Sequence, residues 1–193
     1  MSAPEDAAAR AVTLAVCPAD VVELSTYVVA SADARRRVAG LELPACGRCA
    51  ASAQQLVLST RPGRWLLLSA RAPPGAAAER WTRACAGQGA VVDLSCALTT
   101  LLLGGAHARQ LLSRGCRLDL EPEAFPLGRA AATIMAQVSV VLVALPAGML
   151  LLTPASTAQH LGEWLAASGA PFGLALRPPV SVNQFCEEGS LST

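Results

Sequence analysis

The sequence predicts an α+β fold of two successive β-α-β-β-α-β units, a duplicated ferredoxin-like pattern with mixed or antiparallel sheets. Three observations lead to this prediction. Short β-branched and apolar runs of strand length alternate with segments of helical period. Glycine and proline stand at the ends of these segments, where turns are expected. The same order of elements then occurs a second time within the 193 residues.

The first predicted half covers residues 1–95. Ser31 can cap its first helix, and Gly40 can end that helix in a left-handed conformation. The turn Arg61-Pro62-Gly63-Arg64 joins two strands into a hairpin. The predicted elements are, in order, a strand over 21–30, a helix over 32–39, strands over 55–59 and 65–69, a helix from 73 to about 86, and a strand over 90–94.

The second predicted half covers residues 96–177, and residues 178–193 form a peripheral tail of one compact unit. Gly104-Gly105 ends the first strand of this half, and Gly115 lies just past the last periodic position of its first helix. The predicted elements are a strand over 99–103, a helix over 106–114, a long loop to 128, strands over 131–136, 140–145 and 149–153, a helix over 155–167, and a strand over 172–176.

Composition excludes several classes of function. The formal net charge is +1 and only 4% of residues are aromatic, which does not suit a nucleic-acid surface. Arg35-Arg36-Arg37 is the densest basic group and is expected on a solvated helix face. The sequence contains no lysine, and its basic residues other than histidine are all arginine. Schiff-base chemistry by a lysine is therefore ruled out for this sequence.

Localisation is expected to be cytoplasmic. Glu5 and Asp6 stand where a secretory signal would carry positive charge. The apolar stretch 134–152 is long enough to raise the question of a membrane helix. Gln137, Ser139 and the turn Pro146-Ala147-Gly148 interrupt it. We therefore expect two buried strands joined by a short loop, and no membrane contact.

The seven cysteines do not predict a disulfide framework, because their number is odd and their spacing irregular. Cys46 and Cys49 form a C-x-x-C in a predicted loop. A structural zinc site needs two further ligands, which the sequence does not place nearby. A redox pair would open a helix after a strand, which is not the pattern here. We expect inert thiols and no metal, with metal and redox roles as the open alternatives.

Catalytic constellations are sparse. The sequence has no G-x-S-x-G elbow, no P-loop and no complete dinucleotide fingerprint. Asp119, Glu121 and Glu123 could suggest paired carboxylates, but Arg114 and Arg117 stand beside them, which favours an ion-pair cluster in solvent or at an interface. The two histidines of the chain are expected at the surface rather than as general bases; they are His107 and His160. No catalytic residue is therefore predicted.

Residues 99–128 resemble the γ subunit of the heterotetrameric sarcosine oxidases, whose pattern is roughly T-x-L-x-L-x-G followed by A-R-x-L-L-x-K-G-C-P-L-D-L-H-P-x-A-F-x-x-G. The departures are Arg114 for lysine, Arg117 for proline and Glu121 for histidine. Weaker similarity covers about 41–165, although the acidic pair expected before Trp65 is missing. The matching positions are Thr100, Leu102, Gly104, Ala108, Arg109, Leu111, Leu112, Gly115, Cys116, Leu118, Asp119, Leu120, Pro122, Ala124, Phe125 and Gly128.

This resemblance implies a structural, non-catalytic subunit of a flavoenzyme that oxidatively demethylates sarcosine or a related N-methyl amine. The family is related in fold to the folate-binding domain of the aminomethyltransferases. FAD, FMN, NAD and tetrahydrofolate are expected in the larger α and β subunits and zinc in a small δ subunit, with no cofactor in this chain. The substrate and the stoichiometry of the complex stay open.

The alternative is a free-standing folate-binding protein or aminomethyltransferase-like protein. In those relatives an Asp-x-Ser-His element lies near the substrate site. The corresponding residues here are Asp93, Leu94, Ser95 and Cys96, with cysteine in place of the histidine. We therefore expect Asp93 and Ser95 to hydrogen-bond the strand end and the following loop.

The loop 116–125 is the predicted contact with the larger subunits, because the resemblance is densest there. The hydrophobic fraction of 53% suggests that part of the apolar surface faces another chain. Arginines at the loop could pair with acids of a partner while leucines fill its pockets. The alternative is that the loop only packs on its own chain. The candidate contact residues are Arg114, Cys116, Arg117, Leu118, Asp119, Leu120 and Phe125.

Overall fold

The computed structural model describes residues 12–26, 37–38, 41–52, 54–85 and 87–187. The chain forms a six-stranded sheet in the order β10-β11-β12-β9-β1-β13, a five-stranded sheet in the order β5-β6-β7-β2-β8, and the small pair β3-β4. Among the described residues, every strand pair is antiparallel except β1 with β13. The fold is therefore α+β with mixed sheets, as the sequence predicts.

The five-stranded sheet carries one helix on its outer face. This helix is α2 (Ala76–Cys85), and its side chains Trp81 and Cys85 pack with Val22 and Leu67 of the sheet. The strands of this sheet are β2 (Ala19–Thr26), β5 (Arg48–Ser52), β6 (Gln55–Arg61), β7 (Arg64–Ala70) and β8 (Gly89–Asp93). The predicted hairpin, the helix predicted from 73 to about 86 (α2) and the strand predicted over 90–94 (β8) are confirmed.

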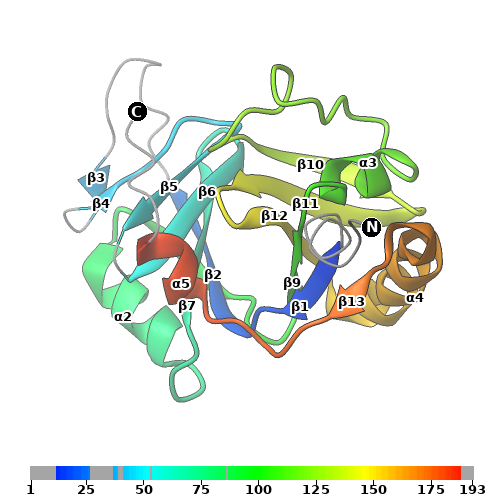
Figure 1. Cartoon of the computed structure of the whole chain (residues 1–193). Helices are drawn as coiled ribbons and strands as arrows, with labels where there is room; N and C mark the ends of the chain where they lie inside the picture. The colour runs from blue at the N-terminus through cyan, green and yellow to red at the C-terminus, as the bar shows by residue number, and fades with distance from the viewer. Residues whose placement is uncertain (1–11, 27–36, 39–40, 53, 86, 188–193) are drawn as a thin grey trace.

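The six-stranded sheet carries two helices on its outer face, α3 (Ala108–Ser113) and α4 (Ala158–Gly169), which lie opposite α2 in Figure 1. Short 3-10 turns precede and follow α4; these are η1 (Ala155–Thr157) and η2 (Ala170–Phe172). The strands are β1 (Thr13–Val16), β9 (Leu98–Gly104), β10 (Ala130–Met135), β11 (Val138–Leu145), β12 (Gly148–Pro154) and β13 (Ala175–Leu176). The molecule is therefore layered helices, sheet, sheet, helix.

The central core lies between the two sheets. Leu56, Leu58 and Leu68 of one sheet meet Leu150 and Leu152 of the other. Alternate residues of β11 and β12 point to this core and to the outer core beneath α3 and α4, so both faces of these strands are buried. That burial explains the apolar composition of the stretch 134–152, which holds the end of β10 followed by the two predicted buried strands, β11 and β12, joined by a short turn. No helix among the described residues is long and apolar enough to cross a membrane.

The sheets also meet along one edge, where β5 and β10 exchange backbone hydrogen bonds. The amide of Cys49 donates to the carbonyl of Gly128 at 2.8 Å, and the amide of Ala130 donates to the carbonyl of Gly47 at 2.9 Å. Arg48 and Arg129 face each other there as an isolated antiparallel bridge. We call this junction, residues 47–49 with 128–130, the seam.

Four predictions of local structure need correction. The helix expected over 32–39 is contradicted at 37–38, because Arg37–Val38 is strand β3 and pairs with β4 (Leu41–Glu42). The other residues of that expected helix, Arg35 and Arg36 among them, lie outside the described residues. The C-x-x-C was expected in a loop, but its second cysteine lies in strand β5. Strand β1 was not predicted from the sequence. The strand expected over 172–176 is reduced to β13, because η2 includes residue 172.

The predicted tail contains a helix. This helix is α5 (Val182–Glu187), and Val182 is fully buried in the core between the sheets. α5 contacts β5, β6 and β7, and Figure 1 shows it beside these strands. Helix α5 therefore closes one side of the central core rather than lying apart from it.

Candidate subunit contact site

The loop 116–125, which follows α3, is held against its own chain by hydrogen bonds from one arginine. Arg109, on the first turn of α3, donates hydrogen bonds from Nη1 to the carbonyl oxygens of Leu120 and Phe125, the latter at 2.8 Å. The side chains of Leu120 and Phe125 are buried in the core beneath α3 and α4. Because hydrogen bonds from a charged donor are strong, Arg109 fixes the path of the loop. The sequence placed Arg109 in the family pattern but assigned it no role.

The seven predicted contact residues fall into three groups. Arg114, Arg117 and Asp119 are exposed, Cys116 and Leu118 are half-buried against the core, and Leu120 and Phe125 are buried. A side chain that is 3% exposed cannot enter a pocket of another subunit, so the expected pocket-filling role of Leu120 is corrected. A contact role for the exposed members stays a prediction.

Arg114 is engaged within its own chain. Its guanidinium lies over the Phe172 ring, with 4.6 Å from Cζ to the ring centroid, and Nη1 reaches the Ser168 carbonyl at 3.4 Å. The His107 ring also stacks against Phe172, with 5.6 Å between ring centroids. These contacts join α3 to η2. Arg117, by contrast, makes no ion pair with any described residue.

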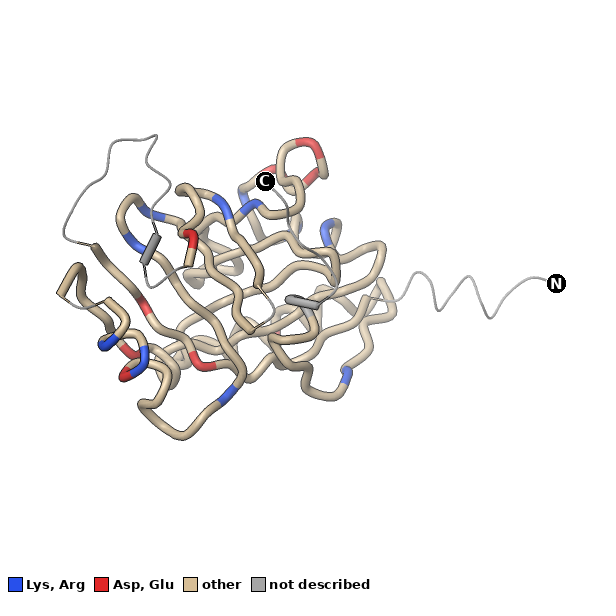
Figure 2. The backbone as a smooth tube through the Cα atoms, turned by 90° about the vertical axis from the view of Figure 1, so that its left-hand side faces the viewer, with Lys and Arg blue, Asp and Glu red and all other residues tan. Residues whose placement is uncertain are grey.

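The acidic side chains of the loop are not arranged for proton transfer. Asp119 Oδ1 accepts a hydrogen bond from the Glu121 amide at 3.0 Å, which closes a local turn. Glu121 and Glu123 are exposed, and Figure 2 shows acidic positions gathered on a protruding loop. The histidines lie apart: His107 Nδ1 is 2.9 Å from Gln110 Oε1, and exposed His160 is 3.1 Å from the Ala136 carbonyl.

The Asp93-Leu94-Ser95-Cys96 element is used for local structure, as predicted. The Ser95 amide donates to Asp93 Oδ1 at 2.9 Å, and Ser95 Oγ accepts a hydrogen bond from the Val21 amide at 3.1 Å. Hydrogen bonding by the Ser95 side chain, followed by its backbone, lowers the pKa of the Asp93 carboxyl. Cys96 is exposed. Ser95 therefore connects the segment after β8 to β2, and Asp93 holds Ser95 in position.

Asp93 also borders an open depression of about 570 Å³ between α2 and β8. Its walls include Gly75, Ala78 and Thr82, with Glu79 and Arg83 as the charged members. No pocket that encloses a ligand is formed there, because the depression is open to solvent. This arrangement brings no nucleophile and base together.

The two cysteines of the C-x-x-C differ in environment. Cys46 is exposed, whereas Cys49 is buried in the core between the sheets. Burial raises the pKa of the Cys49 thiol to about 12, against a smaller lowering by Arg48. Such a thiol is a poor nucleophile at neutral pH. Within the described part of the chain, no group of three or more His, Cys, Asp or Glu side chains is placed to hold a metal ion.

Similarity to solved structures covers nearly the whole fold. A chain of the heterotetrameric sarcosine oxidase from Corynebacterium sp. U-96, in complex with pyrrole 2-carboxylate, is 29% identical, with 86% of this chain and 88% of that chain covered and a TM-score of 0.74. The glycine cleavage system aminomethyltransferase T from Bartonella henselae is 13% identical, with 87% and 48% covered and a TM-score of 0.65. The latter shows a common fold, and this chain spans about half of its length.

Sequence comparison gives a definite family. No curated protein matches the chain. The model of the family described as "Sarcosine oxidase, gamma subunit family" matches residues 21–170, which is more than three quarters of the sequence. The match includes the loop held by Arg109 and most of both sheets, but not β1 or β13. The resemblance found in the sequence is thereby confirmed, and this chain belongs to the sarcosine oxidase, gamma subunit family.

Proposed function

We propose that this chain is the structural γ subunit of a heterotetrameric sarcosine oxidase-type flavoenzyme, which oxidatively demethylates sarcosine or a related N-methyl amine. The observation that carries the proposal is the family match over residues 21–170. The site geometry is consistent with it, because the described residues bring together no nucleophile with a base. In this proposal the chain positions larger subunits and performs no chemical step.

The cofactors belong to other subunits in this proposal. FAD, FMN, NAD and tetrahydrofolate bind to the larger α and β subunits, zinc binds to a small δ subunit, and the assembly works in the cytoplasm. Cys49 supports only the part of this division that concerns zinc, because a buried thiol of raised pKa is a poor metal ligand. The contact with the larger subunits involves the exposed side chains of the loop, Arg117 and Asp119, with Leu118 partly accessible beside them.

We also infer that the chain arose by duplication of one unit, with halves at residues 1–95 and 96–177, although the described elements of the halves do not keep a strict β-α-β-β-α-β order. The supporting observation is the strand order. The run β5-β6-β7-β2 of one sheet corresponds to the run β10-β11-β12-β9 of the other. The edge strand β8 of the first sheet then corresponds to the edge strand β13 of the second. The six-stranded sheet has one strand more, because β1, which precedes β2 in the sequence, lies between β9 and β13.

A free-standing folate-binding protein or aminomethyltransferase-like protein is the second candidate. The fold shared with aminomethyltransferase T favours it. Against it stand Cys96 in place of a histidine and the use of Asp93 and Ser95 in anchoring β8. The two candidates differ in what the isolated chain binds.

The proposal is tested by co-expression with flavoprotein subunits encoded beside this chain. We expect recovery at a fixed ratio, with amine-dependent oxidase activity in the assembly and none in the isolated chain. In parallel, tryptophan fluorescence of the isolated chain is followed during titration with tetrahydrofolate. Saturable micromolar binding that Asp93→Ala abolishes would establish the folate-binding candidate instead. Activity of the chain by itself towards an amine would also contradict the subunit proposal.

A further inference from the structure

Two arginines lie side by side at the seam between the sheets. Arg48 begins β5 and Arg129 immediately precedes β10, and the antiparallel bridge places them directly opposite each other. Hydrogen bonds on both sides of this bridge fix the two backbones, from Cys49 to Gly128 and from Ala130 to Gly47. Both arginines are exposed. Their proximity is therefore imposed by the pairing of the sheets.

Gly47 makes room for one of the guanidinium groups. Its φ of +81° is in the left-handed region that favours glycine. A Cβ at this position would be 3.3 Å from Nη1 and 3.5 Å from Cζ of Arg129. The guanidinium of Arg129 therefore lies against the bare backbone of the seam, and a larger residue at 47 would press on it.

Neither arginine has a counter-ion in the part of the chain that the structure describes. Among the described residues, Arg48 and Arg129 form no ion pair and donate no side-chain hydrogen bond. Like charges directly opposite each other across two strands are destabilising. Arg64 and Arg109 behave differently, since the first pairs with Glu23 and the second binds backbone carbonyls. The seam thus presents two adjacent positive charges that nothing in the described fold neutralises.

We propose that Arg48 and Arg129 bind a carboxylate-bearing segment, rich in Asp or Glu, on another subunit of the assembly. Arginine matches carboxylates bidentately, which gives both strength and a defined orientation. Leu127, in the turn before Arg129, is 53% exposed and supplies an apolar contact beside the charges. A net charge of +1 and 4% aromatic residues do not suit a nucleic acid at this site. The inference rests on the proposed role as a subunit.

The test compares two double variants in the co-expressed assembly. Arg48→Ala with Arg129→Ala removes the seam charges, whereas Arg71→Ala with Arg177→Ala removes two exposed arginines elsewhere and changes net charge equally. We expect the seam variant to bind its partners at least about thirtyfold more weakly, because carboxylates of the partner that become buried in the complex would lose the arginines that pair with them. We also expect the affinity of the wild type, but not of the seam variant, to fall steeply with salt.

Each outcome has one meaning. Selective loss in the seam variant, with circular dichroism unchanged and thermal stability not reduced, supports the site, and Arg48→Glu with Arg129→Glu should then abolish assembly. Equal binding by both double variants overturns the site while leaving the subunit role intact. Failure of the wild type to assemble with any flavoprotein subunit overturns the subunit role itself. Retention that nuclease treatment removes would overturn the acidic-protein partner in favour of a nucleic acid.

Discussion

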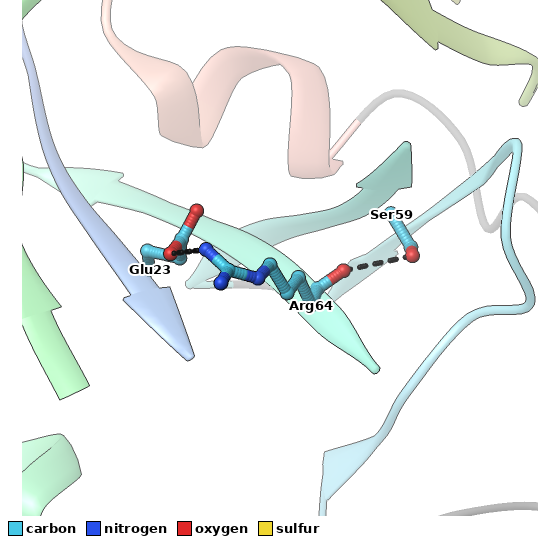
Figure 3. A network of polar contacts seen from close by, with 3 residues as sticks. All are labelled: Glu23, Ser59 and Arg64. Atoms are coloured by element: carbon cyan, nitrogen blue, oxygen red, sulfur yellow. Dashed lines mark hydrogen bonds and ion pairs between the residues drawn. The ribbon is translucent and has the colours of Figure 1, made fainter. Parts of the chain in front are cut away.

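The two sheets differ in the interactions of their side chains: one relies on apolar packing on both faces, and the other also uses local hydrogen bonds and an ion pair. β11 and β12 of the six-stranded sheet are apolar on both faces and fill two cores at once. The five-stranded sheet carries polar groups that are satisfied locally: Ser59 Oγ donates to the Arg64 carbonyl at 2.8 Å, and Arg64 Nη1 pairs with Glu23 at 2.9 Å, as Figure 3 shows. The first arrangement leaves little space for a changed side chain. In the second, Ser59 is buried but the pair of Arg64 and Glu23 is partly exposed to solvent. Equivalent substitutions should therefore cost more in the six-stranded sheet.

The largest difference in the cost of a substitution is expected between two hairpin turns, one in each sheet. In the β11–β12 turn, Gly148 has a φ of +137°, and a Cβ there would lie 2.4 Å from the Leu103 carbonyl oxygen. Gly63, in the β6–β7 turn, has a φ of +72° with no atom within 4 Å of the Cβ position. Since backbone at 103 cannot yield easily, Gly148→Ala should lower the free energy of unfolding by more than about 4 kcal/mol. Gly63→Ala should cost about 1–2 kcal/mol, from backbone strain alone.

Urea unfolding of the two glycine variants, followed by fluorescence, measures both values. The chain itself supplies the control, since both substitutions add one methyl group at a left-handed turn position. Equal losses for Gly148→Ala and Gly63→Ala would show that the close approach of β9 to the β11–β12 turn does not constrain stability.

The contrast between the sheets also explains what the sequence could predict. β9, β11 and β12 were found because long apolar runs end at glycine and proline turns. β5 was missed, since its sequence Arg-Cys-Ala-Ala-Ser lacks the large apolar residues of a strand and is ordered by pairing with β6. β1 has four residues and depends on partners about 90 and 160 positions away. Local patterns do not contain such long-range pairing.

The candidate site was predictable to a similar degree. The family pattern located the loop and its residues correctly in sequence, and it gave the family. It could not separate Leu118, half-buried, from Leu120, buried, because the bend held by Arg109 decides which leucine turns inward. The pair Arg48 and Arg129 was beyond sequence reasoning, since the two residues are brought together only by the seam.

Substitution of Arg109 and of Arg64 should change the free energy of unfolding by different amounts, and this difference should be smaller than that between the two glycine variants. Arg109→Met removes a charged donor from two backbone carbonyls of the loop, and should cost about 2–4 kcal/mol of unfolding free energy. Arg64→Met breaks the pair with Glu23, whose side chains are 52% and 25% exposed, and should cost roughly 1 kcal/mol or less. Both substitutions keep a long apolar stem, so each serves as the control for the other.

The two methionine variants are compared by urea unfolding at low and moderate salt. Only the loss at Arg64 should shrink as salt screens an exposed ion pair. Hydrogen exchange at the amides of 116–125 should rise in Arg109→Met alone. If that loop stays protected, Arg109 does not hold it.

The smallest effect is expected at Asp93, where the five-stranded sheet ends at an exposed carboxylate. Hydrogen bonding by Ser95 lowers the pKa of this carboxyl in the folded state, so the carboxylate form is favoured by folding. The stabilisation is present above the unfolded pKa of about 3.9, and is lost as pH falls through the lower folded pKa. Asp93→Asn keeps an oxygen that accepts from the Ser95 amide but cannot titrate. The stability advantage of the wild type over this variant should therefore shrink between pH 7 and pH 3. Urea unfolding at both pH values measures it, and a constant difference would show that the hydrogen bonds at Ser95 do not favour the charged form.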